Sequence, residues 1–197
     1  MIEHFGKIDE LIGSKEISFL VTSCIEEEGG TFLRNLKEQV TTQILQKITK
    51  KCVDNLQRAR SIPSRYLSTQ NQPSSALPYV STVVEPFTKF LSKKNTVLCV
   101  SEQDIIHWKD ILFADVCSQF QKVSEEILNT FSGAQMFSQS KKKNEDGNVS
   151  IRDKIFAQIV MDVTQFGNLL KSTNVDIEHF QPYQNLLLSI QQQREKK

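Results

Sequence analysis

The chain has few of the residue types and patterns that mark metal-binding or cofactor-binding proteins. Its 197 residues include only 4 cysteines and 3 histidines. The cysteines are Cys24, Cys52, Cys99 and Cys117. They are widely scattered, without the two-residue spacing and the nearby histidine of a zinc site, so we expect free thiols that act as small buried hydrophobes. A glycine-rich phosphate loop, a helix with two histidines four residues apart and an acidic calcium loop are also lacking.

The histidines do not suggest catalysis. A catalytic site needs a nucleophile, a base and an orienting group close together, whereas His4, His107 and His179 each stand alone. We expect His107 to lie at or near the surface of a helix, beside Trp108, and His179 to lie in a turn. The sequence therefore predicts no catalytic residue, no cofactor and no metal ion.

Neither charge nor hydropathy points to a nucleic acid or to a membrane span. The chain has 24 basic and 23 acidic residues, a net charge of +1, so no bulk field draws it to nucleic acid or to an anionic membrane. Apolar runs stay well short of the roughly 20 residues that a membrane helix needs. The N-terminal residues are interrupted early by Glu3, His4 and Asp9, unlike a secretory signal, so we expect a cytoplasmic protein.

Glycine and proline are scarce, at 7 and 5 residues, and the apolar residues recur at helical spacing. The longest such pattern, in residues 31–60, repeats every four residues: Phe32, Leu36, Val40, Ile44, Ile48, Cys52 and Leu56. It predicts a spine helix about 45 Å long with a buried stripe. Residues 1–28 carry a shorter helical pattern, and Gly29 with Gly30 suggests a turn, so residues 1–60 are expected to form a helical hairpin that contains the spine helix.

A proline-punctuated joint, residues 61–74, follows the spine helix. Because proline removes a backbone donor and disfavours a helical conformation in the preceding residue, the spine helix should end near Arg60, and a new helix should begin around Ser74. Residues 75–193 then form a C-terminal helical domain with a mobile loop at about 133–149, where polar and charged residues replace the apolar pattern. The predicted fold is all-α, an elongated helical bundle or rod of about six helices.

The joint and the blocks after it resemble a known family. The residues that carry the resemblance are Pro63, Tyr66, Pro73, Tyr79, Val80, Pro86, Trp108, Asp153, Asp162 and Gly167. In this order and spacing they are similar to the C-terminal domain of subunit 2 of the conserved oligomeric Golgi (COG) complex, a vesicle-tethering family. The resemblance covers roughly residues 60 to 190.

The resemblance implies a non-enzymatic subunit, or a fragment of one, that acts in intra-Golgi vesicle transport and Golgi organisation. It also implies an elongated helical leg, other subunits of the complex as partners, contacts with golgins, small GTPases or SNARE proteins, and a peripheral position on Golgi membranes. A stand-alone helical adaptor or a lipid-surface binding module is the alternative.

Several residues have two interpretations from sequence. Trp108 is a core anchor or a binding hot spot. Lys141, Lys142 and Lys143 either contact anionic lipid headgroups or belong to a solvated loop. Asp153 and Asp162 lie on nearly opposite flanks of one helix and could cap, pair or face solvent. Exposed positions on the 79–90 helix and on the final helix are the expected partner sites.

Overall fold

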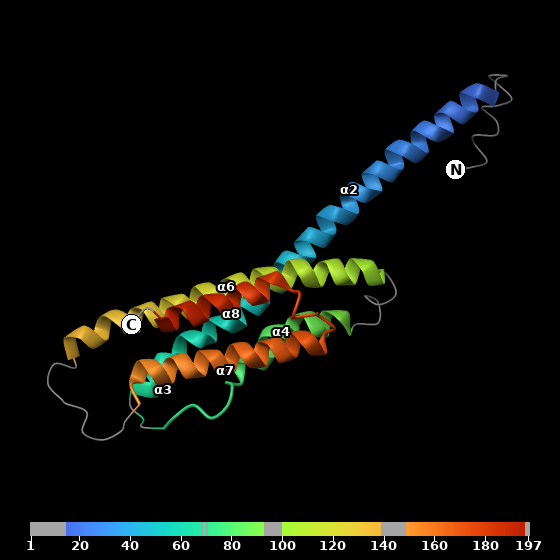
Figure 1. The fold of residues 1–197 in the computed structure, drawn as a ribbon. Coiled ribbons are helices and arrows are strands. Elements are labelled where there is room, and N and C mark those ends of the chain that lie inside the picture. The colour runs from blue at the N-terminus through green and yellow to red at the C-terminus, as the bar shows by residue number, and fades with distance from the viewer. Residues whose placement is uncertain (1–14, 68, 70, 93–99, 139–148, 196–197) are drawn as a thin grey trace. The chain divides into compact units, whose positions relative to one another are not determined.

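The computed structural model describes residues 15–67, 69, 71–92, 100–138 and 149–195, with the backbone alone for residues 15–28 and 132–138. Within these residues every regular element is a helix (Figure 1). The elements are α2 (Lys15–Leu56), the short 3-10 helix η1 (Gln57–Ser61), α3 (Ile62–Leu67), α4 (Tyr79–Leu91), α6 (Glu102–Ser138), α7 (Ile151–Ser172) and α8 (Gln181–Glu195). The all-α helical bundle predicted from sequence is confirmed, and the described part contains six α-helices.

The chain divides into two compact units, residues 1–46 and residues 47–197, and the division falls inside α2. In the first unit α2 runs without interruption through Gly29 and Gly30, so the predicted turn and hairpin are wrong. Two helical glycines cost about 1 kcal/mol each relative to alanine, which the good helix formers around them offset. The opening helical pattern was predicted over residues 1–28, and its part before Lys15 lies outside the described residues.

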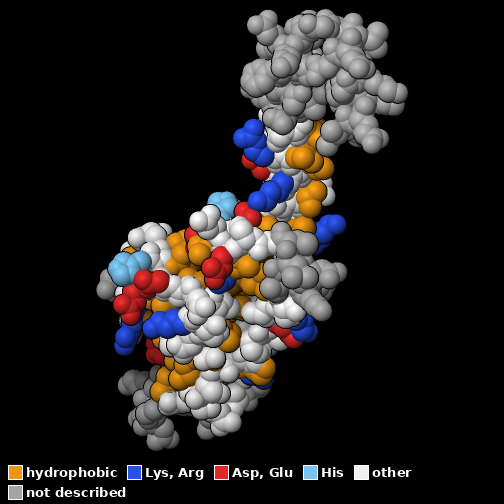
Figure 2. Space-filling view, turned by 90° about the vertical axis from the view of Figure 1, so that its right-hand side faces the viewer, with side chains coloured by type: hydrophobic (Ala, Val, Ile, Leu, Met, Phe, Trp, Pro, Cys, Tyr) orange, Lys and Arg blue, Asp and Glu red, His pale blue; other side chains and the backbone are white. Residues whose placement is uncertain are grey.

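The buried stripe predicted along the spine helix is wrong for part of its length. Phe32, Leu33, Leu36 and Val40 have exposed fractions between 45% and 66%, whereas Ile48, Cys52 and Leu56, in the second unit, are buried. Hydrophobic side chains follow one side of this exposed part of α2 (Figure 2). These residues are helical as their spacing predicts, but spacing does not say whether another element covers the apolar side.

The core of the second unit lies among α4, α6, α7 and α8. Lys109 on α6 donates to the Thr173 carbonyl beyond the end of α7, and Phe120 on α6 packs against Phe166 near the C-terminal end of α7, so these helices run antiparallel. Large buried core side chains are Phe87, Phe113, Phe120, Phe166, Leu112, Leu128, Ile155, Ile159, Leu170 and Leu186.

Helix α8 runs antiparallel to α7, because the start of α7 meets the end of α8. Arg152 donates to the Gln193 carbonyl, and Tyr183 donates to the Val163 carbonyl. Helix α8 also packs along α6, where Ser189 donates to Glu125. The apolar side of each helix thus faces the same core.

The joint differs from its prediction at both ends. Helix α2 ends at Leu56, and the chain continues through η1 into α3, with Pro63 in the first turn of α3, where proline is tolerated. The next helix, α4, begins at Tyr79 rather than near Ser74. Hydrogen bonds to α7 hold the chain between α3 and α4 in a non-helical course, and sequence spacing could not reveal these long-range partners.

Ser101 and Ser150 cap the helices that follow them. Each hydroxyl accepts the backbone N–H three residues on, from Asp104 and Asp153 respectively, at 3.1 Å, which is the hydrogen bond of an N-terminal helix cap. Helix α6 extends to Ser138, so the first part of the predicted 133–149 loop is helical. Residues 139–148, which include Lys141, Lys142 and Lys143, lie outside the described residues, and the lipid contact stays a prediction.

Candidate functional site

A buried cluster of polar side chains ties the joint to α7. We call Tyr66, Tyr79, Gln158 and Asp162 the α7 polar cluster. Tyr66 donates its hydroxyl to Gln158 Oε1 at 2.5 Å, and Tyr79 donates to Asp162 Oδ2 at 2.9 Å. Gln158 Nε2 donates to Asp162 Oδ1 at 2.8 Å, one helical turn along α7. All four side chains are buried.

The cluster also fixes the backbone that leads into α4. The Leu77 N–H donates to Asp162 Oδ1 at 2.8 Å, and Gln158 Nε2 donates to the Ser75 carbonyl at 3.0 Å. Buried polar groups normally need such partners, because an unpaired one costs about 1 to 3 kcal/mol. The hydrogen bonds of the α7 polar cluster therefore hold the segment between α3 and α4 against α7.

Electrostatics distinguish this cluster from a catalytic acid and base pair. Burial raises the pKa of the Asp162 carboxyl, and the hydrogen bonds from Leu77, Tyr79 and Gln158 act in the opposite direction. Burial also raises the pKa of Tyr66, and burial together with the Asp162 charge raises the pKa of Tyr79, so both phenols stay protonated donors. The donors and acceptors of these side chains are hydrogen-bonded to one another, which suits a structural role.

The other carboxylate of the sequence pattern has a separate position. Asp153 lies in the first turn of α7, where its N–H and side chain both meet the Ser150 hydroxyl. A carboxylate there also favours the helix dipole. Asp153 therefore contributes to the helix cap with Ser150, whereas Asp162 is buried and hydrogen-bonded to Tyr79. The structure does not bring the two carboxylates together.

Gly167 gives Tyr183 room to cross α7. A Cβ built at Gly167 would meet the Tyr183 hydroxyl oxygen at 2.2 Å and ring carbon Cζ at 2.5 Å. In this position the Tyr183 hydroxyl donates to the Val163 carbonyl at 3.2 Å, and the ring contacts Phe166. The requirement for glycine comes from a residue of α8, which sequence reasoning did not identify.

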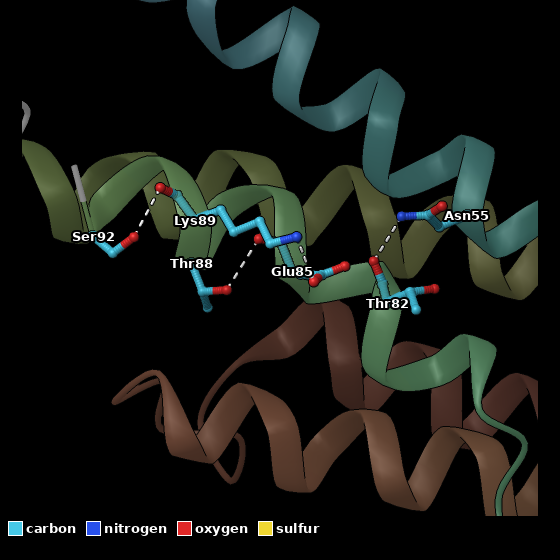
Figure 3. A network of polar contacts seen from close by, with 6 residues as sticks. All are labelled: Asn55, Thr82, Glu85, Thr88, Lys89 and Ser92. Atoms are coloured by element: carbon cyan, nitrogen blue, oxygen red, sulfur yellow. Dashed lines mark hydrogen bonds and ion pairs between the residues drawn. The ribbon is translucent and has the colours of Figure 1, made fainter.

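Pro86 lies inside α4 and leaves one carbonyl of that helix without its normal donor. Because proline has no N–H, the Thr82 carbonyl four residues earlier loses its helical hydrogen bond. The side-chain amide of Asn55, from the last turn of α2, donates to that carbonyl at 2.7 Å (Figure 3). Pro86 therefore creates a contact between α4 and α2, and Asn55 was not identified from sequence.

The remaining conspicuous residues are structural or exposed. Trp108 is only 5% exposed and packs against Phe90 with ring centroids 6.0 Å apart, so it is a core residue. Val80 is fully buried, and Pro73 lies in the segment between α3 and α4. Five apolar side chains of α4 are buried in the core, Tyr79, Val80, Val83, Val84 and Phe87, whereas Pro86 and Phe90 are half-buried and remain open to a partner. On the final helix Leu188 is 52% exposed.

The titratable side chains do not assemble into a reactive site within the described residues. Burial raises the pKa of the Cys52 and Cys117 thiols to about 12, so both stay protonated. His107 is exposed, and the exposed His179 ring contacts Asp176 at 2.8 Å, which raises the histidine pKa and lowers that of the carboxyl. In the described part of the chain no group of three or more histidine, cysteine, aspartate or glutamate side chains could hold a metal ion. His4, Cys99 and the Cys24 side chain lie outside it.

Comparison with known proteins agrees with the sequence resemblance. Residues 6–163 match the family model described as "COG complex component, COG2, C-terminal". Two relatives are named conserved oligomeric Golgi complex subunit 2. The one from Arabidopsis thaliana is 25% identical over 178 residues, which are 84% of this chain and 24% of the relative. The one from Dictyostelium discoideum is 24% identical over 181 residues, which are 87% of this chain and 20% of the relative.

The chain spans about a quarter of the length of these relatives or less. No solved structure matches it. The family match ends at Val163, so it includes the joint, all four residues of the α7 polar cluster and most of the second unit. The chain belongs to the family of the C-terminal region of subunit 2 of the conserved oligomeric Golgi complex.

Proposed function

We propose that the chain is a non-enzymatic subunit, or a part of one, of a Golgi vesicle-tethering complex, acting in intra-Golgi transport and Golgi organisation. Its partners are other subunits of the complex, and golgins, small GTPases or SNARE proteins are further candidates. It lies peripherally on the cytoplasmic side of Golgi membranes through these partners. The observation that carries the proposal is the family match over residues 6–163.

The surface of the first unit supports a role in assembly. Phe32, Leu33, Leu36 and Val40, which we call the α2 apolar face, lie at spacings of one, three and four residues and are exposed. Apolar side chains at such spacings suit packing against another helix. We propose that a helix of another subunit of the complex covers the α2 apolar face, since the relatives are named as subunits of that complex.

Membrane association through partners fits the hydropathy of the helices. Across the part of the chain that the structure describes, none of the helices combines the length and apolar character needed to cross a bilayer. The alternative function, a stand-alone adaptor or lipid-surface module, needs no complex and makes a different prediction in the same experiment.

Affinity purification of the tagged chain from its own cells, followed by mass spectrometry, tests the proposal. Recovery of other subunits of the Golgi tethering complex is expected. Leu33→Glu with Leu36→Glu should abolish that recovery, whereas Gln39→Glu with Gln43→Glu, at exposed polar positions of the same helix, should preserve it. A folded wild-type chain that recovers none of these subunits would favour the adaptor, and unchanged recovery with the first variant would exclude the α2 apolar face.

A further inference from the structure

A groove lies between the last turns of α2 and the C-terminal half of α4, entirely within the second unit. We call it the α2–α4 groove. It has a volume of about 380 Å³. Its apolar lining comes from Ile48, Pro86 and Phe90, and its charged lining includes Lys47 and Lys51. Of its apolar lining residues only Ile48 belongs to the buried core, and no residue of the α7 polar cluster or of the α2 apolar face lines the groove.

The charges on the groove are unbalanced. Three lysines line it, Lys47, Lys51 and Lys89, against one carboxylate among its described lining residues, Glu85. Lys89 pairs with Glu85 at 2.7 Å, one turn apart on α4 (Figure 3). Within the described residues Lys47 and Lys51 take part in no ion pair. Like charges four residues apart destabilise a helix slightly, so these two lysines work against α2 unless a negative group lies opposite them.

The apolar lining is recessed and held in place. Ile48 lines the groove and is only 7% exposed. Phe90 is half-buried, and its contact with Trp108 restricts the ring. Pro86 adds a rigid apolar surface at the point where α4 is held to α2 through Asn55 and Thr82. A preformed apolar pocket with a polar rim is the usual arrangement at sites that accept one anchoring side chain.

We propose that the α2–α4 groove binds a short acidic segment of a partner protein, with one large apolar side chain inserted against Ile48 and Phe90 and carboxylates beside Lys47 and Lys51. A bilayer presents a broad surface that cannot fill a recess between two helices, so the concave shape favours a peptide. This inference adds a partner site to the proposed function but does not depend on it, because peptide binding is measured without the complex.

Fluorescence polarisation with the full-length chain tests the proposal. The probe is a fluorescein-labelled synthetic peptide with a central Leu-Phe pair flanked on both sides by glutamates. We expect saturable binding that weakens as salt is raised. Lys47→Glu with Lys51→Glu should weaken it about tenfold or more, because two attractive contacts become repulsive. A peptide with lysines in place of the glutamates, and one with alanines in place of the Leu-Phe pair, should both bind far more weakly.

Lys122→Glu with Lys171→Glu is the matched control, since these exposed lysines lie outside the groove and the charge change is the same. It should bind the probe like the wild type. Equal weakening by both double variants, equal binding of the acidic and basic peptides, or no binding at low salt would each overturn the proposal. The proposal would also be overturned if the acidic peptide did not bind and the chain instead floated with phosphatidylserine vesicles in a manner that depends on Lys47 and Lys51.

Discussion

At the scale of single residues, Asp162 carries the most structural information. It is a fully buried carboxylate in the middle of α7 that accepts hydrogen bonds from the neutral donors of Leu77, Tyr79 and Gln158. Removing a partner from such a group is costly, because the remaining donors are left unpaired in a low-dielectric interior. One residue thereby decides where the segment before α4 runs.

The raised pKa of Asp162 predicts an unusual pH dependence. Its folded-state pKa lies above the unfolded value, so between the two values the folded state binds more protons and acidification stabilises it through this group. Asp162→Asn removes the titration. We expect the free energy of unfolding of the wild type, measured by denaturant titration, to rise relative to that of Asp162→Asn as the pH falls from 7 towards about 4. A difference between the two proteins that stays constant, or shrinks, over that range would contradict the prediction.

Gly167 gives a second residue-scale prediction. Gly167→Ala places a Cβ against the Tyr183 hydroxyl and ring, and we expect a loss of about 1 to 3 kcal/mol from the free energy of unfolding, the usual cost of overpacking a core. Thermal and denaturant unfolding measure it.

Gly30→Ala is the matched control for Gly167→Ala, because no side chain lies within 4 Å of its Cβ position apart from its chain neighbours, and alanine favours the helix. It should leave stability unchanged or raise it. Equal losses for the two variants would show that the contact with Tyr183 has no effect.

At the scale of elements, α4 is stabilised by one hydrogen bond from α2, which Asn55 donates to the Thr82 carbonyl. Asn55→Ala leaves the Thr82 carbonyl without a donor and should cost about 1 kcal/mol of unfolding free energy. In a Pro86→Ala background the new backbone N–H can bond that carbonyl, so the same Asn55→Ala change should cost less. A double-mutant cycle by denaturant unfolding measures this coupling, and strictly additive effects would refute the role given to Asn55.

Elements also show where sequence patterns succeed and where they stop. The helical spacing of the apolar residues is a local signal, and the structure confirms the all-α fold that this spacing predicts. The start of α4 was placed too early because its position depends on Asp162, more than eighty residues away. Local propensity contains no information about such a partner.

At the scale of the whole molecule, the two units differ in how their helices are supported. The side chains of residues 31–40 are all exposed, whereas the second unit has an extensive buried core. A helix without tertiary packing has marginal stability and opens readily. Brief trypsin digestion of the full chain should therefore cut after Arg34 and Lys37 sooner than after Lys109 and Lys154. Mass spectrometry of timed samples measures the order, and equal rates at these sites would contradict it.

The sequence by itself determined the helical class, the family and the absence of a recognisable catalytic or metal motif, because helical periodicity, caps and ordered motif residues are local or linear features. Only the tertiary structure decided that Tyr66, Tyr79, Gln158 and Asp162 form one cluster, that Asn55 compensates for Pro86, and that the stripe on α2 is buried in one part and exposed in another. These outcomes depend on contacts between residues far apart in the chain, and the spacing of residues along a sequence does not specify which elements will meet.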